Sequence, residues 1–359
     1  MVTGPVFVLR GRNYLPTVWG DDRVLLDHAI NRTGPIGRFH VLDPFGLLDP
    51  FTGYATFLLR LTTEFVRIGS LDHFASNTFF LMSIMWTLFA CWIATIISHV
   101  AHPLVGFFAA LAFATMPFSN LVMLSQINTL YMPLVLILDL TVVTRKYPKS
   151  AWNQLLIVIL FTALALTTVT VGIALIYLAY LVFKRREFVQ NTEIRLFRCL
   201  AAATVIQAFS YTSRGHSLSF GVIVKEFLRC ANAFAPQFIR VQVLQQKSFW
   251  ESLVLYGIPI ILFSMVFILI RISKTSPEIE LVRIALGLFV FGFVTMIALV
   301  IGNAWLNSHY LFIPTGLFWI GALLTAKSAI AGSNKYKFIP VGVLVVIFLS
   351  SLSGTYFVI

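Results

Sequence analysis

Residues 145–186 read RKYPKSAWNQLLIVILFTALALTTVTVGIALIYLAYLVFKRR, with a basic cluster at each end and a long apolar run between them. Basic clusters beside apolar runs mark the cytoplasmic ends of membrane helices, so both ends of this stretch are expected on the cytoplasmic side. The polar run TTVTVG occupies residues 167–172, in its middle. Two short helices over 155–167 and 172–184 return the chain to the same side, whereas one long tilted helix does not. We therefore predict a helical hairpin that dips through the membrane.

The composition of the whole chain is that of an integral membrane protein. Of its 359 residues, 58% are hydrophobic and 11% are charged, whereas soluble domains carry about 25% charged residues. This composition excludes a soluble globular enzyme. We expect an all-α, polytopic transmembrane protein with about 10 membrane helices, since a spanning helix needs about 20 apolar residues. The predicted helices cover 78–98, 104–118, 121–144, 155–167, 172–184, 197–213, 252–272, 282–302, 309–326 and 338–358.

The chain has a formal net charge of +12, and the positions of its basic residues indicate its membrane topology. Lys and Arg gather in the short segments 145–153, 184–196, 271–281 and 327–337, which we expect to be cytoplasmic and to face anionic headgroups. Membrane lipids are thus expected partners and nucleic acid is not. The expected location is a multi-pass position in a cell membrane, and we expect the bacterial inner membrane.

Cysteine and histidine give no metal site or disulfide framework. Cys91, Cys199 and Cys230 are odd in number and widely spaced. His99 and His102 have the spacing of a metal pair, but no carboxylate or third ligand lies near them in the sequence. No metal-binding residues are therefore assigned.

With this topology the outer face collects the polar residues that a scaffold of helices and loops does not explain. The outer segments are 1–77, 119–128, 168–171, 213–250 and 303–308. Their unusual residues are Asp21, Asp22, Arg60, Gln126, Asn128, Arg214, His216, Asn303 and His309, the last at the start of a helix. Polar residues that converge from distant segments are typical of a site. We therefore predict an outer segment over 1–77 that carries part of the site, and a multi-helix transmembrane domain over 78–359.

Residues 53–67 of the outer segment are predicted to form an amphipathic surface helix. Tyr54 and four further apolar residues fall on one stripe at helical spacing, and Arg60, Glu64 and Arg67 fall on the opposite face. Such a helix is too polar to span the membrane, so we expect it to lie flat on the outer surface.

Asp21 and Asp22 follow Trp19-Gly20 in the outer segment. A carboxylate at a membrane surface can deprotonate an acceptor hydroxyl as a general base, but Gly-Asp-Asp is also ordinary turn chemistry. Arg60 could hold a phosphate through its planar donor fork, or it could pair with Glu64 on a wet helix face. From these residues alone both alternatives stay open.

The outer turn before the helix that starts near residue 309 carries two further candidates. Asn303 lies in it, and His309 could bind a phosphate or shuttle a proton. The alternative for this turn is a belt of amphipathic side chains at the membrane interface, which is common.

The order of these features resembles the membrane glycosyltransferases of the GT-C superfamily. An acidic pair in the first outer loop is matched by Asp21-Asp22, and a Gly-Tyr-x-x-x-x-x-Arg surface helix is matched by residues 53–60. An outer loop before a short helix pair is matched by residues 125–128 and the hairpin, and a late Arg-Tyr and Pro motif corresponds to His309 through Pro314. Family members carry a transmembrane helix before the acidic loop, which this sequence lacks, and His309 stands where they have Arg.

The resemblance implies an enzyme that moves a sugar from a polyprenyl-phosphate donor to a cell-envelope glycan, lipid or protein acceptor on the outer face. It implies Asp21 or Asp22 as the catalytic base. It also implies that Arg60, with Arg214 or His309, binds the donor phosphate. Substrate contacts are assigned to the outer residues Tyr54, Gln126, Asn128 and Asn303. No cofactor is certain, and a divalent metal ion could assist.

Two other classes of function fit the sequence. The first is a transporter or flippase of lipid-linked saccharides, although transporters usually bury ionisable residues near the bilayer midplane and Asp139 is nearly alone in the apolar runs. The second is a non-catalytic membrane subunit, which an absent first helix would favour.

Overall fold

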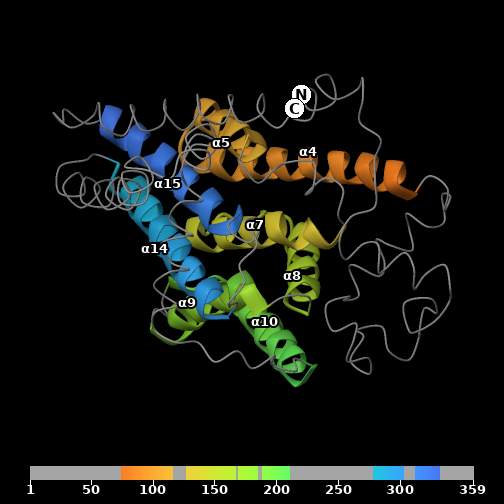
Figure 1. The fold of residues 1–359 in the computed structure, drawn as a ribbon. Coiled ribbons are helices and arrows are strands. Elements are labelled where there is room, and N and C mark those ends of the chain that lie inside the picture. Colours follow the sequence, from red (N-terminus) through yellow and green to blue (C-terminus); the bar gives the residue numbers. More distant parts are fainter. Residues whose placement is uncertain are drawn as a thin grey trace, which may run out of the picture. The chain divides into compact units, whose positions relative to one another are not determined.

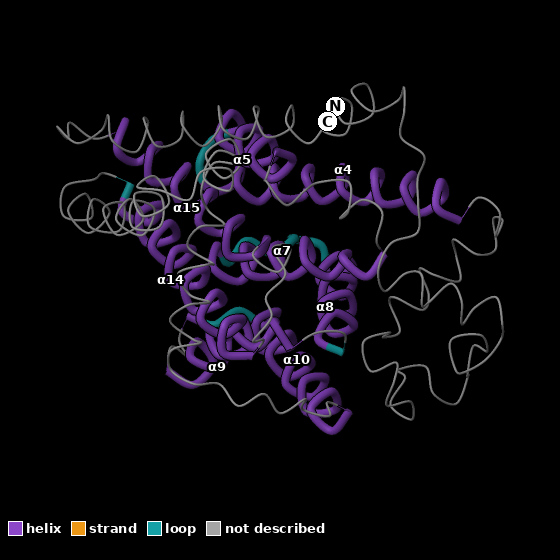
Figure 2. Tube along the Cα trace, in the orientation of Figure 1, coloured by secondary structure: helices purple, strands orange, loops and turns teal. Residues whose placement is uncertain are grey.

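The computed structural model describes residues 74–115, 127–166, 169–184, 188–210, 278–302 and 312–331, and all regular elements within them are helices (Figure 1, Figure 2). In chain order they are α4 (Phe74–Val100), α5 (Pro103–Thr115), η1 (Ile127–Leu130), α7 (Tyr131–Thr144), α8 (Ala151–Ala165), η2 (Val169–Val171), α9 (Gly172–Lys184), α10 (Asn191–Ser210), α14 (Ile279–Gly302) and α15 (Phe312–Ala331). η1 and η2 are short 3-10 helices.

Three of these helices are long and apolar enough to cross a membrane. The qualifying stretches are Phe80–Val100 in α4, Ile279–Ala298 in α14 and Phe312–Ala331 in α15. α5, α7, α8 and α9 are apolar but shorter. A helix of 14 residues such as α7 is about 21 Å long, less than the roughly 30 Å of a bilayer's hydrocarbon core.

The chain forms two compact units, which are described separately. Among the described residues, unit 1 comprises 87–115, 278–302 and 312–331, and unit 2 comprises 74–86, 127–166, 169–184 and 188–210. The described helices of unit 1 are the second half of α4, α5, α14 and α15, and those of unit 2 are the first half of α4 and α7 to α10.

In unit 1, α14 and α15 pack against each other in opposite directions. Lys327 near the end of α15 forms an ion pair of 3.0 Å with Glu278, which precedes α14. Further along, the rings of Phe289 and Phe318 lie 5.7 Å apart. A residue early in α14 thus contacts a residue late in α15, and a later residue of α14 contacts an earlier residue of α15. The two helices are therefore antiparallel, with the start of α14 beside the end of α15.

Glycines let the helices of unit 1 approach closely. A Cβ on Gly321 of α15 would lie 3.2 Å from the Phe289 ring, and one on Gly292 of α14 would lie 3.1 Å from the Phe318 ring. At the α4–α5 connection, a Cβ on Gly106 would overlap the Ser98 side chain and the Ala94 carbonyl oxygen. Any larger residue at Gly106 would therefore require the two helices to separate.

In unit 2, α7 is buried on every side from Met132 to Thr144, while α8, α9 and α10 each present an exposed apolar stripe. On α8 the stripe consists of Trp152, Leu155, Leu156 and Ile159, which recur at the spacing of one helix face. Soluble proteins rarely expose large apolar side chains in contiguous stripes. These faces are what a helix in contact with lipid requires.

The predicted helices overlap the observed ones, with differences at their ends. α9 has the predicted bounds, whereas α10 begins at Asn191, six residues before the predicted start, and α15 runs five residues past its predicted end. Each of these extensions contains a charged side chain in an ion pair, Glu193 in α10 and Lys327 in α15. Sequence patterns assign such residues to loops because the pairing partners are distant in the chain. The predicted helices 252–272 and 338–358 lie outside the described residues.

Candidate functional site

The residues predicted to form the outer site fall almost entirely outside the described part of the chain. This applies to Asp21, Asp22, Tyr54, Arg60, Gln126, Arg214, Asn303 and His309, and to the predicted surface helix 53–67. Asn128 alone belongs to a described element, the 3-10 helix η1. Their roles therefore stay predictions.

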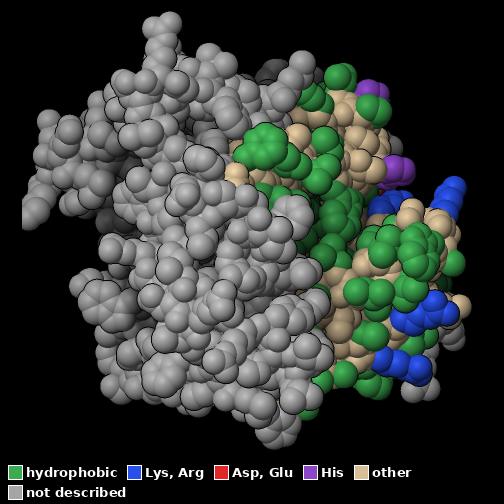
Figure 3. Space-filling view, turned by 90° about the vertical axis from the view of Figure 1, so that its right-hand side faces the viewer, with side chains coloured by type: hydrophobic (Ala, Val, Ile, Leu, Met, Phe, Trp, Pro, Cys, Tyr) green, Lys and Arg blue, Asp and Glu red, His purple; other side chains and the backbone are tan. Residues whose placement is uncertain are grey.

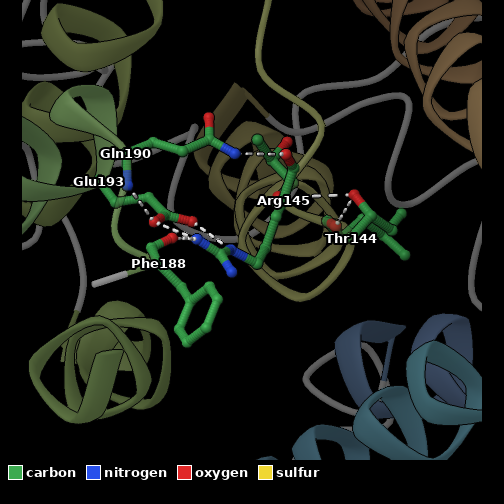
Figure 4. Close-up of polar contacts among 7 residues, drawn as sticks. Thr144, Arg145, Phe188, Gln190 and Glu193 are labelled. Atoms are coloured by element: carbon green, nitrogen blue, oxygen red, sulfur yellow. Dashed lines mark hydrogen bonds and ion pairs between the residues drawn. The ribbon is translucent and has the colours of Figure 1, made fainter. Parts of the chain in front are cut away.

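The principal polar cluster of the described residues lies where α7 ends and α10 begins, and sequence analysis did not find it. The Arg145 guanidinium donates to both carboxylate oxygens of Glu193, from Nε at 2.7 Å and from Nη2 at 2.8 Å (Figure 4). The same guanidinium also donates to the carbonyl of Phe188. The Glu193 side chain is fully buried, and that of Arg145 is 29% exposed. This two-pronged contact is the strong form of an Arg–carboxylate pair.

Glu193 also caps its own helix. Its Oε2 accepts a hydrogen bond of 2.9 Å from the backbone N–H of Gln190, the residue before α10. A Glu at the third helical position that reaches back to the capping residue is one half of a capping box. The signal in the sequence is therefore Gln190-Asn191-Thr192-Glu193, although Gln is not among the preferred capping residues.

Arg145 closes α7 through its backbone as well as its side chain. It is the C-cap residue, with φ 55° and ψ 27°, the left-handed conformation that usually falls to glycine. A side chain in this conformation carries a cost of roughly 1–2 kcal/mol. The ion pair with Glu193 explains why Arg rather than Gly occupies the position.

Three helix ends meet at the first two turns of α10. The C-cap of α7 is joined by the Arg145–Glu193 pair, and the first turn of α8 is joined by a hydrogen bond of 2.9 Å from Thr192 to Gln154. The end of α9 is joined by the edge-to-face contact of Phe183 with Phe197, whose ring centroids are 5.7 Å apart. Because α8 starts and α9 ends at this one place, the two form a helical hairpin. Its passage through a membrane stays a prediction.

The loop between α7 and α8 is held by the same set of contacts. The side-chain amide of Gln154 donates to the Pro148 carbonyl at 2.8 Å. Burial raises the pKa of Tyr147 in this loop, the Glu193 carboxylate adds to the rise and Arg145 opposes it. The hydrogen bond to Glu193 raises the pKa of Arg145. The rise at Tyr147 thus follows mainly from burial in the helix junction, and the rise at Arg145 follows from its contact with the Glu193 carboxylate.

Exposed cations surround this junction. They are Lys146, Lys149, Lys184, Arg195 and Arg198. The acids in the described residues of unit 2 are Asp139 and Glu193, and both are fully buried. The exposed charge of this end is therefore positive in the described residues, as expected for the cytoplasmic end of membrane helices.

The opposite end of unit 2 holds the turns that sequence analysis assigned to the outer face. α7 ends at the junction, so η1 at its start, with Asn128, lies at the other end. η2 joins the far ends of α8 and α9, and it contacts α7. α10 also leads away from the junction, and Ser210 ends it four residues before Arg214.

Asp139 lies inside α7 and is a buried acid without a hydrogen-bond partner among the described residues. Its side chain is 0% exposed, and neither carboxylate oxygen has a hydrogen-bond partner among the described residues. A buried carboxylate without a partner is costly. In membrane helices such groups often mark substrate or ion pathways.

The histidine pair considered as a metal site has local structural roles. His102 precedes α5, and its Nδ1 accepts a hydrogen bond of 3.2 Å from the backbone N–H of Leu104, as a helix cap does. The Nδ1 of His99 lies 2.7 Å from the Thr95 carbonyl oxygen. Among the described residues no group of three or more His, Cys, Asp or Glu side chains could hold a metal ion.

The Arg145–Glu193 junction is built to hold helices together rather than to act on a substrate. Both carboxylate oxygens are engaged, and the carboxylate is sealed from solvent. A general base needs an oxygen within reach of the proton that it removes. Comparison with protein-family models, with curated proteins and with solved structures gives no match.

Proposed function

We propose that the protein is a membrane glycosyltransferase of the GT-C type. It transfers a sugar from a polyprenyl-phosphate donor to a cell-envelope glycan, lipid or protein on the outer face of the membrane. The proposal rests on the ordered set of the Asp21-Asp22 pair, the Gly53–Arg60 helix motif and the segment from His309 to Pro314. The regular elements of the described residues are all helices, and three of them contain apolar stretches of spanning length, which supports the proposal.

The observation that carries the proposal is the polarity of unit 2 from one end to the other. Exposed cations gather at the α7–α10 junction, while η1 and η2 lie at the far end. Asn128 belongs to η1, and Gln126 directly precedes it. Polar residues are common at turns of any membrane bundle, so their part in the proposal is that they lie at the end of unit 2 where the outer site is proposed.

The chemistry proposed at the outer face is a single displacement. Asp21 or Asp22 takes the proton of the acceptor hydroxyl, whose oxygen attacks the anomeric carbon. The bond from that carbon to the lipid phosphate oxygen breaks, and the polyprenyl phosphate leaves with the electron pair. Arg60, with Arg214 or His309, stabilises the charge that develops on the phosphate.

Turnover of polyprenyl-phosphate sugars by the purified protein tests the proposal. A panel of radiolabelled donors is combined with membrane-extracted acceptors, and Asp21→Asn, Asp22→Asn and the double variant are compared with Asp43→Asn. Asp43 lies in the same segment but outside the motif, so it controls for charge. Removing a general base should lower the rate by about 10²–10⁴-fold. Full activity of the double variant would reject the catalytic role of the pair.

Transport of a lipid-linked saccharide is the second candidate, and the position of Asp139 favours it. This acid is fully buried within α7 without a described partner, as in many transporters. Reconstituted vesicles that flip a fluorescent lipid-linked sugar, but do not transfer it, would support this candidate. Loss of flipping in Asp139→Asn with retained folding would link the acid to transport.

A further inference from the structure

The corner where α9 meets α10 gathers three exposed cations from two helices. Lys184 is the last residue of α9, and Arg195 and Arg198 lie on the exposed side of α10. The contact of Phe183 with Phe197 joins the helices at this point. Lys184 directly follows the first of these rings and Arg198 directly follows the second, and Arg195 lies one turn before Arg198 on the same exposed side of α10.

The charge of this corner is not neutralised within the described part of unit 2. Of the two acids there, Asp139 lies inside α7 and Glu193 is engaged by Arg145 and the Gln190 N–H. One face of the described part shows Lys and Arg side chains among exposed hydrophobic ones, and no Asp or Glu (Figure 3). The corner therefore offers positive charge to an external anion.

Apolar stripes lead from these cations along both helices. On α9 the exposed residues Ile176, Tyr180 and Phe183 recur at helical spacing and end beside Lys184. On α10 the exposed line of Arg195 and Arg198 continues through Ala202 to Val205 and Ile206. A ligand that covers the whole surface must therefore combine an anionic group with hydrocarbon.

We propose that an anionic membrane lipid binds at the α9–α10 corner, with its phosphate held by Lys184, Arg195 and Arg198. Its acyl chains lie along the apolar stripes of α9 and α10. Arg supplies planar donor forks that match phosphate oxygens, and Lys adds a compact charge. A soluble anion would leave the apolar stripes uncovered. The lipid would seal the end of the hairpin to α10, which is a role separate from sugar transfer.

Native mass spectrometry of the full chain tests the proposal. The protein is purified in an uncharged detergent, stripped of lipid and titrated with phosphatidylglycerol or phosphatidylcholine. Arg195→Gln/Arg198→Gln is compared with Lys146→Gln/Lys149→Gln, a control that removes the same charge from exposed cations ahead of α8. Gln has a helix propensity near that of Arg, so α10 should persist. Unchanged thermal midpoints of both variants would verify folding.

We expect tight binding of phosphatidylglycerol and weak binding of phosphatidylcholine. A cation near an anionic lipid surface contributes about fivefold in affinity, so the Arg195/Arg198 variant should lose about 25-fold. The control should lose less than about threefold, and raised salt should weaken phosphatidylglycerol binding to the native protein.

Three results would overturn the proposal. Equal losses in the two variants would mean diffuse attraction rather than a site at this corner. Equal binding of the two lipids would exclude recognition of the anionic headgroup. Displacement of the lipid by millimolar inorganic phosphate would identify a site for a soluble anion instead.

Discussion

Replacement of Arg145 by Ala is expected to destabilise the protein by about 3 kcal/mol. The change leaves the fully buried Glu193 carboxylate with the Gln190 N–H as its remaining described donor, at 2.9 Å. Removing one partner of a buried ion pair typically costs about 3–5 kcal/mol. The lower value applies because the Arg145 side chain is 29% exposed, so water can reach the vacated position.

The backbone of Arg145 provides a matched comparison. Gly adopts the left-handed conformation at φ 55° without the steric cost that Ala pays. Arg145→Gly should therefore be more stable than Arg145→Ala by about 1 kcal/mol, although both lose the ion pair. Arg145→Lys keeps the charge but not the fork, and should fall between the native protein and Arg145→Ala.

Unfolding in mixed micelles, titrated with denaturing detergent and followed by far-ultraviolet circular dichroism, measures these differences. The double variant Arg145→Ala/Glu193→Ala should be more stable than the sum of its single changes by about 1–3 kcal/mol, because the two side chains contact each other. A loss below about 0.5 kcal/mol in Arg145→Ala, the range of an ordinary surface change, would refute the role assigned to the junction.

Three further changes probe other parts of the described chain. Gly321→Ala should cost about 1 kcal/mol in thermal unfolding, since its Cβ would lie 3.2 Å from the Phe289 ring, and Gly321→Ala/Phe289→Leu should lose less than the sum of its two single changes. His102→Ala should cost about 1 kcal/mol by removing the cap of Leu104 N–H, and His102→Asn should recover most of it; equal stability of the two would contradict the cap. Burial raises the pKa of Tyr147 above its ordinary value of about 10. The contribution of the neutral Tyr147 side chain to the free energy of unfolding is therefore constant below about pH 10 and decreases as the pH rises further. Tyr147→Phe should show a smaller alkaline loss of thermal midpoint than the native protein, and an identical slope would contradict it.

Local patterns of the sequence were enough to predict helices where apolar runs are bounded by cations. α9 has the predicted bounds because Gly172 and Lys184 mark both of its ends. The break between α8 and α9 follows from a polar run between two basic clusters. Both features depend on residues that are close together in the chain.

Pairing over long distances could not be predicted in this way. Arg145 and Glu193 are 48 residues apart, and each resembles an ordinary loop charge in the sequence. The early start of α10 depends on that pair, because the Glu193 carboxylate is both a cap and the partner of Arg145. The capping-box spacing of Gln190 and Glu193 is visible in the sequence, but it does not identify Arg145 as the partner of the buried carboxylate.

The predicted catalytic residues are of a different kind. Asp21, Asp22 and Arg60 come from the order of motifs and lie outside the described residues, so their roles depend on activity measurements. The described helices supply a supporting condition, which is that the turns η1 and η2 lie away from the cationic junction. The proposed outer site therefore requires that the end of unit 2 with η1 and η2 faces the outside and that the cationic junction faces the cytoplasm.

Accessibility of introduced cysteines from intact cells tests that assignment most directly. In a background with Cys91, Cys199 and Cys230 replaced by Ser, single cysteines are placed at Ser150 and Asn191, which are exposed at the junction, and at Asn128 in η1. A membrane-impermeant maleimide should label Asn128→Cys in intact cells. It should label Ser150→Cys and Asn191→Cys after the membranes are inverted and not before. Labelling of both junction positions from outside, or of the two from opposite sides, would contradict the account.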